Sequence, residues 1–374
     1  MEFNYLKNIL DDLFVRFESK YSPSSYQLKR QLCVLNRNEK LLIRKKILDY
    51  NIGALQVLEI LCETGILSLT GYLENLPDEA EMQGIIADVL DSDDMMTLLK
   101  EIVISGTKSE SINCNFQECL HQYVVDVVLR PELIRNEFIT KIESQLPSNI
   151  FKEMIAFNFI NELLSFHSND DSHSINDLTQ IISIQKQWNV EYQEEKFNLL
   201  TKILNNLSIN HSHDIGEYLL KQLQMKEVNN WFYMLFLIKH IKEEANLVGE
   251  FKKFFKNLLK KFHEMQENNN LYLMFILARQ LFHYRQENSC YKSWVKLTIG
   301  ELHYNLKDQE KFTFALQALQ NMIFFENDLN VLEIHAQTSI TSPRGSLSLI
   351  HEYKQLLKTR INALSSPEIV MDLT

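Results

Sequence analysis

Proline and glycine are both scarce in this chain. Only 9 glycines and 6 prolines occur in 374 residues, so glycine falls far below its usual share of about 7%. Antiparallel sandwiches and barrels need glycine in their turns, and doubly wound sheets need it in phosphate-binding loops, so both classes are disfavoured. No proline lies between Pro147 and Pro343. Because proline breaks helices, this interval permits a long series of them.

Cysteine is also rare, and its spacing is irregular. The chain has five cysteines, at positions 33, 62, 114, 119 and 290. This odd number in a long chain predicts reduced thiols and not a disulfide framework. The first residues lack the basic and apolar stretches of a signal peptide. The longest apolar run, Trp231 to Ile238, is far shorter than the ~18 residues that a membrane helix needs. We therefore expect an intracellular protein, nuclear or cytoplasmic, with no membrane partner.

Motifs for nucleotide binding and hydrolysis are missing as well. The sequence contains no glycine-rich dinucleotide fingerprint, no P-loop, no H-E-x-x-H and no G-x-S-x-G. We predict no catalytic residue, no cofactor and no metal ligand, and hence a protein that is not an enzyme.

Two spacings resemble metal sites. Cys114, Cys119 and His121 form a C-x4-C-x-H pattern without the second ligand pair that structural zinc needs. The adjacent His213 and Asp214 resemble the doublet of all-helical phosphohydrolases, but Asp214 is also a good helix cap. Buried thiols and a cap are the favoured interpretations. A metal-dependent hydrolase around His213 and Asp214 is kept as the second alternative function.

The pattern that is present has the period of an α-helix. In residues 251–262 the phenylalanines and leucines recur at steps of three and four, and the lysines occupy the other face. Similar periodicity predicts helices over most of the chain, among them 26–49, 148–166, 191–207, 214–225 and 245–266. The run at 231–238 is apolar on all sides, which predicts a buried central helix. The expected fold class is all-α.

The predicted helices of the second half pair at roughly 35–40 residues, the size of a helical-repeat unit. They lack the small residues of tetratricopeptide repeats and the ankyrin signature, and they resemble HEAT or armadillo repeats. We expect an α-solenoid, a stack of antiparallel helix pairs, with a globular helical bundle as the alternative.

The expected organisation has two helical domains. We place an N-terminal domain at 1–166, a polar linker at 167–174, a C-terminal helical-repeat domain at 175–364 and a tail at 365–374. The first 150 residues hold 23 acidic and 15 basic side chains, so most of the net charge of −11 lies in the N-terminal domain.

Two basic segments are the candidate binding residues, for an acidic partner or a nucleic acid. A solvated helix face is the favoured interpretation of each of them. The first consists of Lys29, Arg30, Arg37, Lys40, Arg44, Lys45 and Lys46, and the second of Lys252, Lys253, Lys256, Lys260 and Lys261.

The segment Leu-Pro-Ser-Asn-Ile-Phe-Lys-Glu-Met-Ile at 146–155 resembles part of the helical-repeat adaptor subunits of the Fanconi anaemia core complex, group F especially. This resemblance implies a nuclear scaffold of DNA repair. The predicted function is a non-catalytic adaptor that joins other protein subunits in a larger complex, and the first alternative is nucleic-acid binding through segments 29–46 and 252–261.

Overall fold

The computed structural model describes residues 2–18, 25–47, 52, 54–92, 94–134, 138–166, 173, 175–225, 228–240, 245–284, 289–302, 308–343 and 345–366. Every regular element within these ranges is a helix, and none of these residues forms a strand. The prediction of an all-α fold is confirmed. Apart from His173, the linker predicted at 167–174 lies outside the described residues, as does the tail from residue 367 onward.

The chain divides into two compact units, Met1–Glu162 and Leu163–Thr374. The helices of the first unit are α1 (Glu2–Glu18), α2 (Ser25–Cys33), α3 (Arg37–Ile47), α4 (Leu55–Glu63), α5 (Leu69–Leu73), α6 (Glu79–Leu90), α7 (Met96–Gly106), α8 (Glu110–Leu129), η1 (Pro131–Leu133), α9 (Phe138–Ile142), η2 (Glu143–Gln145), α10 (Ser148–Phe151) and η3 (Lys152–Ala156). The division falls within α11 (Phe157–Ser165).

The second unit continues with longer helices. They are α12 (Leu178–Glu191), η5 (Glu195–Phe197), α13 (Asn198–Met225), α14 (Trp231–His240), α15 (Ala245–Met265), α16 (Asn268–Phe282), α17 (Ser289–Val295), η6 (Lys296–Gly300), α19 (Gln309–Ile323), α20 (Leu329–Gln337) and α21 (Leu347–Ser365). Two elements, η3 and η6, are π-helical, and the other η elements are 3-10 turns.

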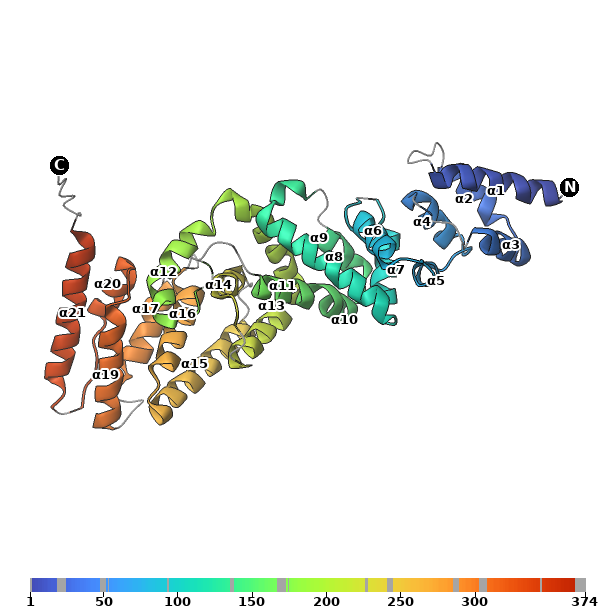
Figure 1. The fold of residues 1–374 in the computed structure, drawn as a ribbon. Coiled ribbons are helices and arrows are strands. Elements are labelled where there is room, and N and C mark those ends of the chain that lie inside the picture. The colour runs from blue at the N-terminus through green and yellow to red at the C-terminus, as the bar shows by residue number, and fades with distance from the viewer. Residues whose placement is uncertain are drawn as a thin grey trace, which may run out of the picture. The chain divides into compact units, whose positions relative to one another are not determined.

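Within each unit, helices pack mainly against their neighbours along the chain. In the first unit α8 packs against α6 and α7, and α7 against α5. In the second unit α15 packs against α13 and α16, and α21 against α19 and α20, as Figure 1 shows at the red end of the chain. Contacts between neighbouring elements are typical of stacked helix pairs, which is consistent with the helical-repeat fold.

The core of the second unit is built around α14 and α16. All eight residues from Trp231 to Ile238 are buried, as the sequence predicts. Helix α16 is buried almost as completely, from Asn270 to Phe282 apart from one half-buried position, and it contacts α12, α14, α15, α17 and α19. The sequence predicts a helix at 270–286 but not its central position, because this helix carries polar residues on its buried surface.

The segment predicted as one helix over 26–49 is two helices, which corrects the sequence prediction. The reason is a capping box at Asn36 and Glu39. The side chain of Asn36 accepts hydrogen bonds from the backbone N–H groups of Asn38 (2.9 Å) and Glu39 (3.1 Å), and the Glu39 carboxylate accepts one from the backbone N–H of Asn36 (2.7 Å). This reciprocal pairing starts a new helix at Arg37.

The helices predicted separately at 191–207 and 214–225 meet at a kink within α13. Backbone angles leave the helical range at His211 (φ −126°, ψ 18°), inside the polar stretch 205–213 where the sequence predicts a break. Leu207, His211 and Ile215, on both sides of the kink, are buried. The first of the two helical stretches begins at Asn198, later than the predicted start at 191.

Candidate docking surface

Helix α15 separates its apolar and basic side chains onto opposite faces. Phe251, Phe254, Phe255 and Phe262 are all buried. The five lysines of the predicted basic segment, Lys252, Lys253, Lys256, Lys260 and Lys261, are all exposed. Two of them form ion pairs along the helix, Lys253 with Glu250 (2.6 Å) and Lys260 with Glu264 (3.8 Å).

Three of these lysines form the rim of a groove, which we call the α15 groove. It has a volume of about 600 Å³, and it lies between α15, α16, α17, η6 and the start of α19. Its residues are Lys252, Phe255, Lys256, Leu259, Lys260, His263, Glu264, Met274, Trp294, Leu297, Thr298 and Lys311. The apolar members come from four elements, and the lysines come from α15 and α19. The sequence showed only the α15 contribution.

His263 lines this groove without a hydrogen-bond partner for either ring nitrogen among the described residues. Burial first, and the nearby charge of Lys311 second, lower the pKa of His263 to about 4. The ring is therefore neutral at physiological pH, and the positive charge of the groove comes from its lysines.

The first basic segment is divided between two helices, α2 and α3. Lys29 on α2 pairs with Glu63 (2.6 Å), and the ammonium group of Lys40 on α3 donates to the carbonyl of Thr64 (2.7 Å). Arg37, Lys40 and Arg44 line a shallow hollow of about 370 Å³. Arg30, Lys45 and Lys46 are exposed and do not line it. Because the capping box divides this segment, its charges belong to two helices.

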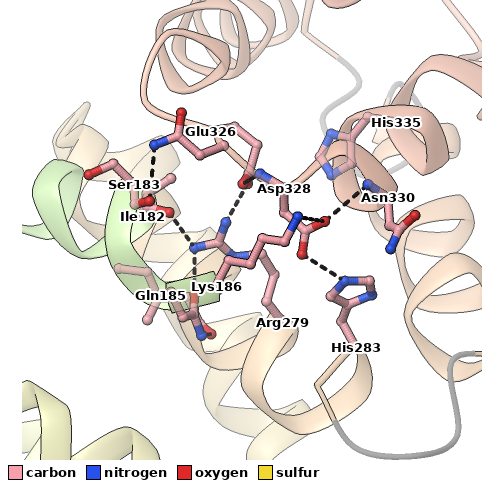
Figure 2. Close-up of polar contacts among 12 residues, drawn as sticks. Ile182, Ser183, Gln185, Lys186, Arg279, His283, Glu326, Asp328, Asn330 and His335 are labelled. Atoms are coloured by element: carbon pink, nitrogen blue, oxygen red, sulfur yellow. Dashed lines mark hydrogen bonds and ion pairs between the residues drawn. The ribbon is translucent and has the colours of Figure 1, made fainter. Parts of the chain in front are cut away.

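The sequence analysis missed a buried cluster of ionisable groups in the second unit. Arg279 of α16 forms an ion pair with Glu326. The Arg279 side chain is 1% exposed and the Glu326 side chain is 2% exposed. Figure 2 shows the Arg279 guanidinium between Glu326 and two groups of α12, the carbonyl of Ile182 (3.2 Å) and the amide oxygen of Gln185. A lone arginine inside an apolar helix is the sequence signal, but its partner lies 47 residues away.

Asp328 is the second carboxylate of this cluster. It caps α20 by accepting from the backbone N–H of Asn330 (3.0 Å), and it receives a hydrogen bond from His283 (3.1 Å) (Figure 2). The hydroxyl of Tyr284 donates another hydrogen bond to it (3.0 Å). Burial alone raises its pKa, but these hydrogen bonds and the charge of His283 outweigh burial and lower the pKa to about 2. Lys186 adds a longer ion pair at 3.9 Å.

His335 and Lys354 extend the buried cluster toward α21. The ring of His335 lies between the hydroxyls of Tyr291 (3.2 Å) and Tyr353 (2.9 Å). Burial, followed by the charges of Lys354 and Arg279, lowers the pKa of His335 to about 3. The ammonium group of Lys354 donates to the carbonyls of His335 (2.7 Å) and Ala336 (2.8 Å), so it caps the C-terminus of α20. These contacts join helices, and so the cluster has a structural role.

The two spacings that resemble metal sites are held by other contacts. Cys119 donates to the carbonyl of Gln83 (3.6 Å), and burial raises the pKa of its thiol to about 11. His121 hydrogen-bonds to Glu162 (2.5 Å). His213 pairs with Glu217 (3.3 Å) on its own helix. No group of three or more His, Cys, Asp and Glu residues suited to a metal ion occurs in the part of the chain that the structure describes.

No described helix combines the length and the apolar character needed to cross a membrane. None of the curated proteins matches the chain. The family model of the Fanconi anaemia group A protein N terminus matches residues 44–366. This match includes the segment 146–155, and it supports a relationship to the Fanconi anaemia proteins. The matching family is that of group A, whereas the sequence resemblance pointed to group F. Because the match covers most of the sequence, the chain belongs to the family of the Fanconi anaemia group A protein N terminus.

Proposed function

We propose that this chain is a non-catalytic scaffold subunit of a nuclear genome-maintenance complex. The observation that carries the proposal is the family match over residues 44–366. The fold supports it, because stacked helix pairs expose long surfaces to partner subunits. HEAT-like or armadillo-like stacking and the two-domain division at 167–174 are parts of the same proposal.

The role of the buried ionisable groups supports a scaffold over an enzyme. Catalytic groups with shifted pKa values are expected in a cleft that substrate can enter. Here Arg279, Glu326, Asp328 and His335 are at most 3% exposed, and their hydrogen bonds join α12, α16, α20 and α21. The shifted pKa values of Arg279, Asp328 and His335 are therefore accounted for by helix packing.

Affinity purification of the full-length tagged chain from its own cells tests the proposal. We expect a constant set of protein subunits to copurify with the chain at fixed ratios. Cells without the chain are expected to become more sensitive to DNA-damaging agents, and re-expression of the chain restores resistance. A chain that purifies alone, with unchanged damage resistance in its absence, would contradict the proposed function.

Nucleic-acid binding is the second candidate function, favoured by the five exposed lysines of α15. Neutralised phosphates supply most of the affinity in such binding, which makes it strongly dependent on salt.

A further inference from the structure

We propose that the α15 groove binds an amphipathic α-helix of a partner subunit, with an apolar face that covers Trp294 and Leu297 and with Asp or Glu residues that meet the lysine rim. The inference deepens the proposed scaffold function and rests on it, because it requires a protein partner. It assigns a site and an occupant chemistry to one surface of the second unit.

The charges of the groove select an acidic occupant. Lys252, Lys256 and Lys260 form one edge, and Lys311 of α19 adds a fourth positive charge. Glu264 is the sole carboxylate among the lining residues, and it is already paired with Lys260. The whole chain is acidic, with a net charge of −11, so this local excess of positive charge opposes the overall balance. Complementary charge across an interface favours the matching partner and rejects like-charged ones.

The apolar residues that line the groove favour a partner helix with an apolar face. Leu297 has 61% of its surface exposed although it stands beside the half-buried Trp294 and Leu259. Leu297 belongs to the π-helical element η6, whose last residue, Gly300, accepts hydrogen bonds from the backbone and the side chain of Thr341 (2.9 and 2.8 Å). This tie to the Thr341 loop holds η6 in place, and π-helical turns occur frequently at functional sites. Covering such an exposed leucine with apolar surface stabilises a complex.

The spacing of the lysines matches a helix. Lys252, Lys256 and Lys260 follow one another at four-residue steps, which correspond to a rise of about 6 Å along the axis. A partner helix aligned with α15 repeats at the same interval, so acidic residues at i, i+4 and i+8 meet successive lysines. Recognition of an amphipathic helix in an apolar groove follows this pattern of anchors on one face.

The aromatic arrangement favours a protein over a single-stranded nucleic acid. Binding of single strands depends on aromatic faces that are open for bases to stack on. Trp294 packs against Phe255, Phe275 and Phe282, and a stacked contact with Tyr291 (5.8 Å, 24° between planes) covers one of its faces. Phe255 is 3% exposed. The remaining apolar members, Leu259, Met274 and Leu297, are aliphatic.

Site-specific photo-crosslinking in the full-length chain tests the inference. A photoreactive amino acid replaces Leu297 in tagged protein expressed in its own cells, and the crosslinked peptides are sequenced by mass spectrometry. The control carries the same amino acid at Leu347, which is 73% exposed on α21 and outside the groove. We expect crosslinks from position 297, and not from 347, to a segment with apolar residues at helical spacing and flanking Asp and Glu residues.

Matched substitutions provide the second measurement. Lys256→Glu and Leu297→Glu are compared with Lys358→Glu and Leu347→Glu, which change residues of α21 that are also exposed. We expect about a tenfold loss of the crosslinked partner in the first pair and no change in the second. Replacing the partner's acidic residues by lysine restores binding to Lys256→Glu. Unchanged circular dichroism and thermal unfolding verify that each variant folds.

The outcomes separate this inference from the proposed function. If the same subunits copurify with all four variants, or if the crosslinked segment is basic, the groove proposal fails and the scaffold function stands. Crosslinks from position 297 to DNA or RNA overturn the groove proposal in favour of the nucleic-acid alternative. If the wild-type chain copurifies with no protein at all, the scaffold function itself fails.

Discussion

At the scale of single residues, the buried ion pair between Arg279 and Glu326 joins α12, α16 and α21 to the segment between α19 and α20. Arg279 also donates hydrogen bonds to the carbonyl of Ile182 and the amide oxygen of Gln185 on α12. Arg360 of α21 donates to the backbone carbonyl of Glu326 (3.1 Å). Buried ion pairs add little net stability, but removal of one partner leaves an uncompensated charge. We therefore expect the cluster to contribute more to selecting one arrangement of these helices than to the net stability of the fold.

We predict that Arg279→Met lowers the free energy of unfolding by about 3–5 kcal/mol, because Glu326 stays buried without a counter-charge. Chemical denaturation monitored by circular dichroism measures the change. The double variant Arg279→Met with Glu326→Leu is the control, and we expect it to recover much of the loss. A loss below about 1 kcal/mol in the single variant speaks against this account.

His335 makes stability depend on pH. Its folded-state pKa is lowered to about 3 because it is fully buried next to Lys354 and Arg279, whereas an unfolded histidine titrates near 6.5. Below pH 6.5 the unfolded state therefore binds more protons, and the free energy of unfolding falls toward pH 3 with a slope of up to about 1.4 kcal/mol per pH unit.

The corresponding prediction compares unfolding at pH 7 and pH 4.5. His335→Gln, which keeps a hydrogen-bonding side chain and loses the titration, is expected to show a shallower decline than the wild type. His351→Gln, on the exposed face of α21, serves as the control with the wild-type slope. Identical slopes for wild type and His335→Gln would refute the assignment.

At the scale of the helix, the contact between α13 and α15 depends on the absence of a side chain. A methyl group at Gly216 would lie 2.2 Å from the side chain of Leu247, which is buried. Gly249 on α15 has open space at the same position. The two glycines therefore have opposite roles, although both lie inside helices.

We predict that Gly216→Ala destabilises the protein by about 1–3 kcal/mol, since the two helices must separate or Leu247 must change rotamer. Gly249→Ala is the matched control and is expected to leave stability unchanged or raise it by up to about 1 kcal/mol, because alanine favours helix. Thermal unfolding of both variants measures the difference. Equal effects at the two positions would show that α13 and α15 adapt without strain.

At the scale of the whole molecule, charge decides between the two candidate functions. The chain carries a net charge of −11, and the exposed lysines of the second unit include five on one face of α15. We predict that the purified full-length chain shows no salt-dependent binding to single- or double-stranded oligonucleotides. Fluorescence anisotropy measures this binding between 50 and 200 mM salt. Over this range the affinity of phosphate-driven binding falls by a factor of about 10³–10⁵. Binding that falls steeply with salt and disappears in Lys256→Glu with Lys260→Glu supports the nucleic-acid alternative instead.

Several parts of the structure were predictable because they depend on neighbouring residues. The helical period of residues 251–262 places the phenylalanines inside and the lysines outside, and the apolar run at 231–238 requires burial on every side. The division of segment 26–49 into two helices also depends on neighbouring residues, because Asn36 and Glu39 form the capping box that starts the second helix.

Local sequence alone determined that this protein is all-α, where most of its helices lie and which faces they bury, because helix formation and amphipathicity depend on residues within one or two turns. Only the tertiary structure decided that Arg279 pairs with Glu326 and that Leu247 packs against Gly216. It also decided that lysines of α15 and α19 line one groove together with Leu297. Arg279 and Glu326, Gly216 and Leu247, and the groove lysines of α15 and α19 are each separated by 30 or more positions along the chain. Packing in three dimensions, not local preference, brings them together.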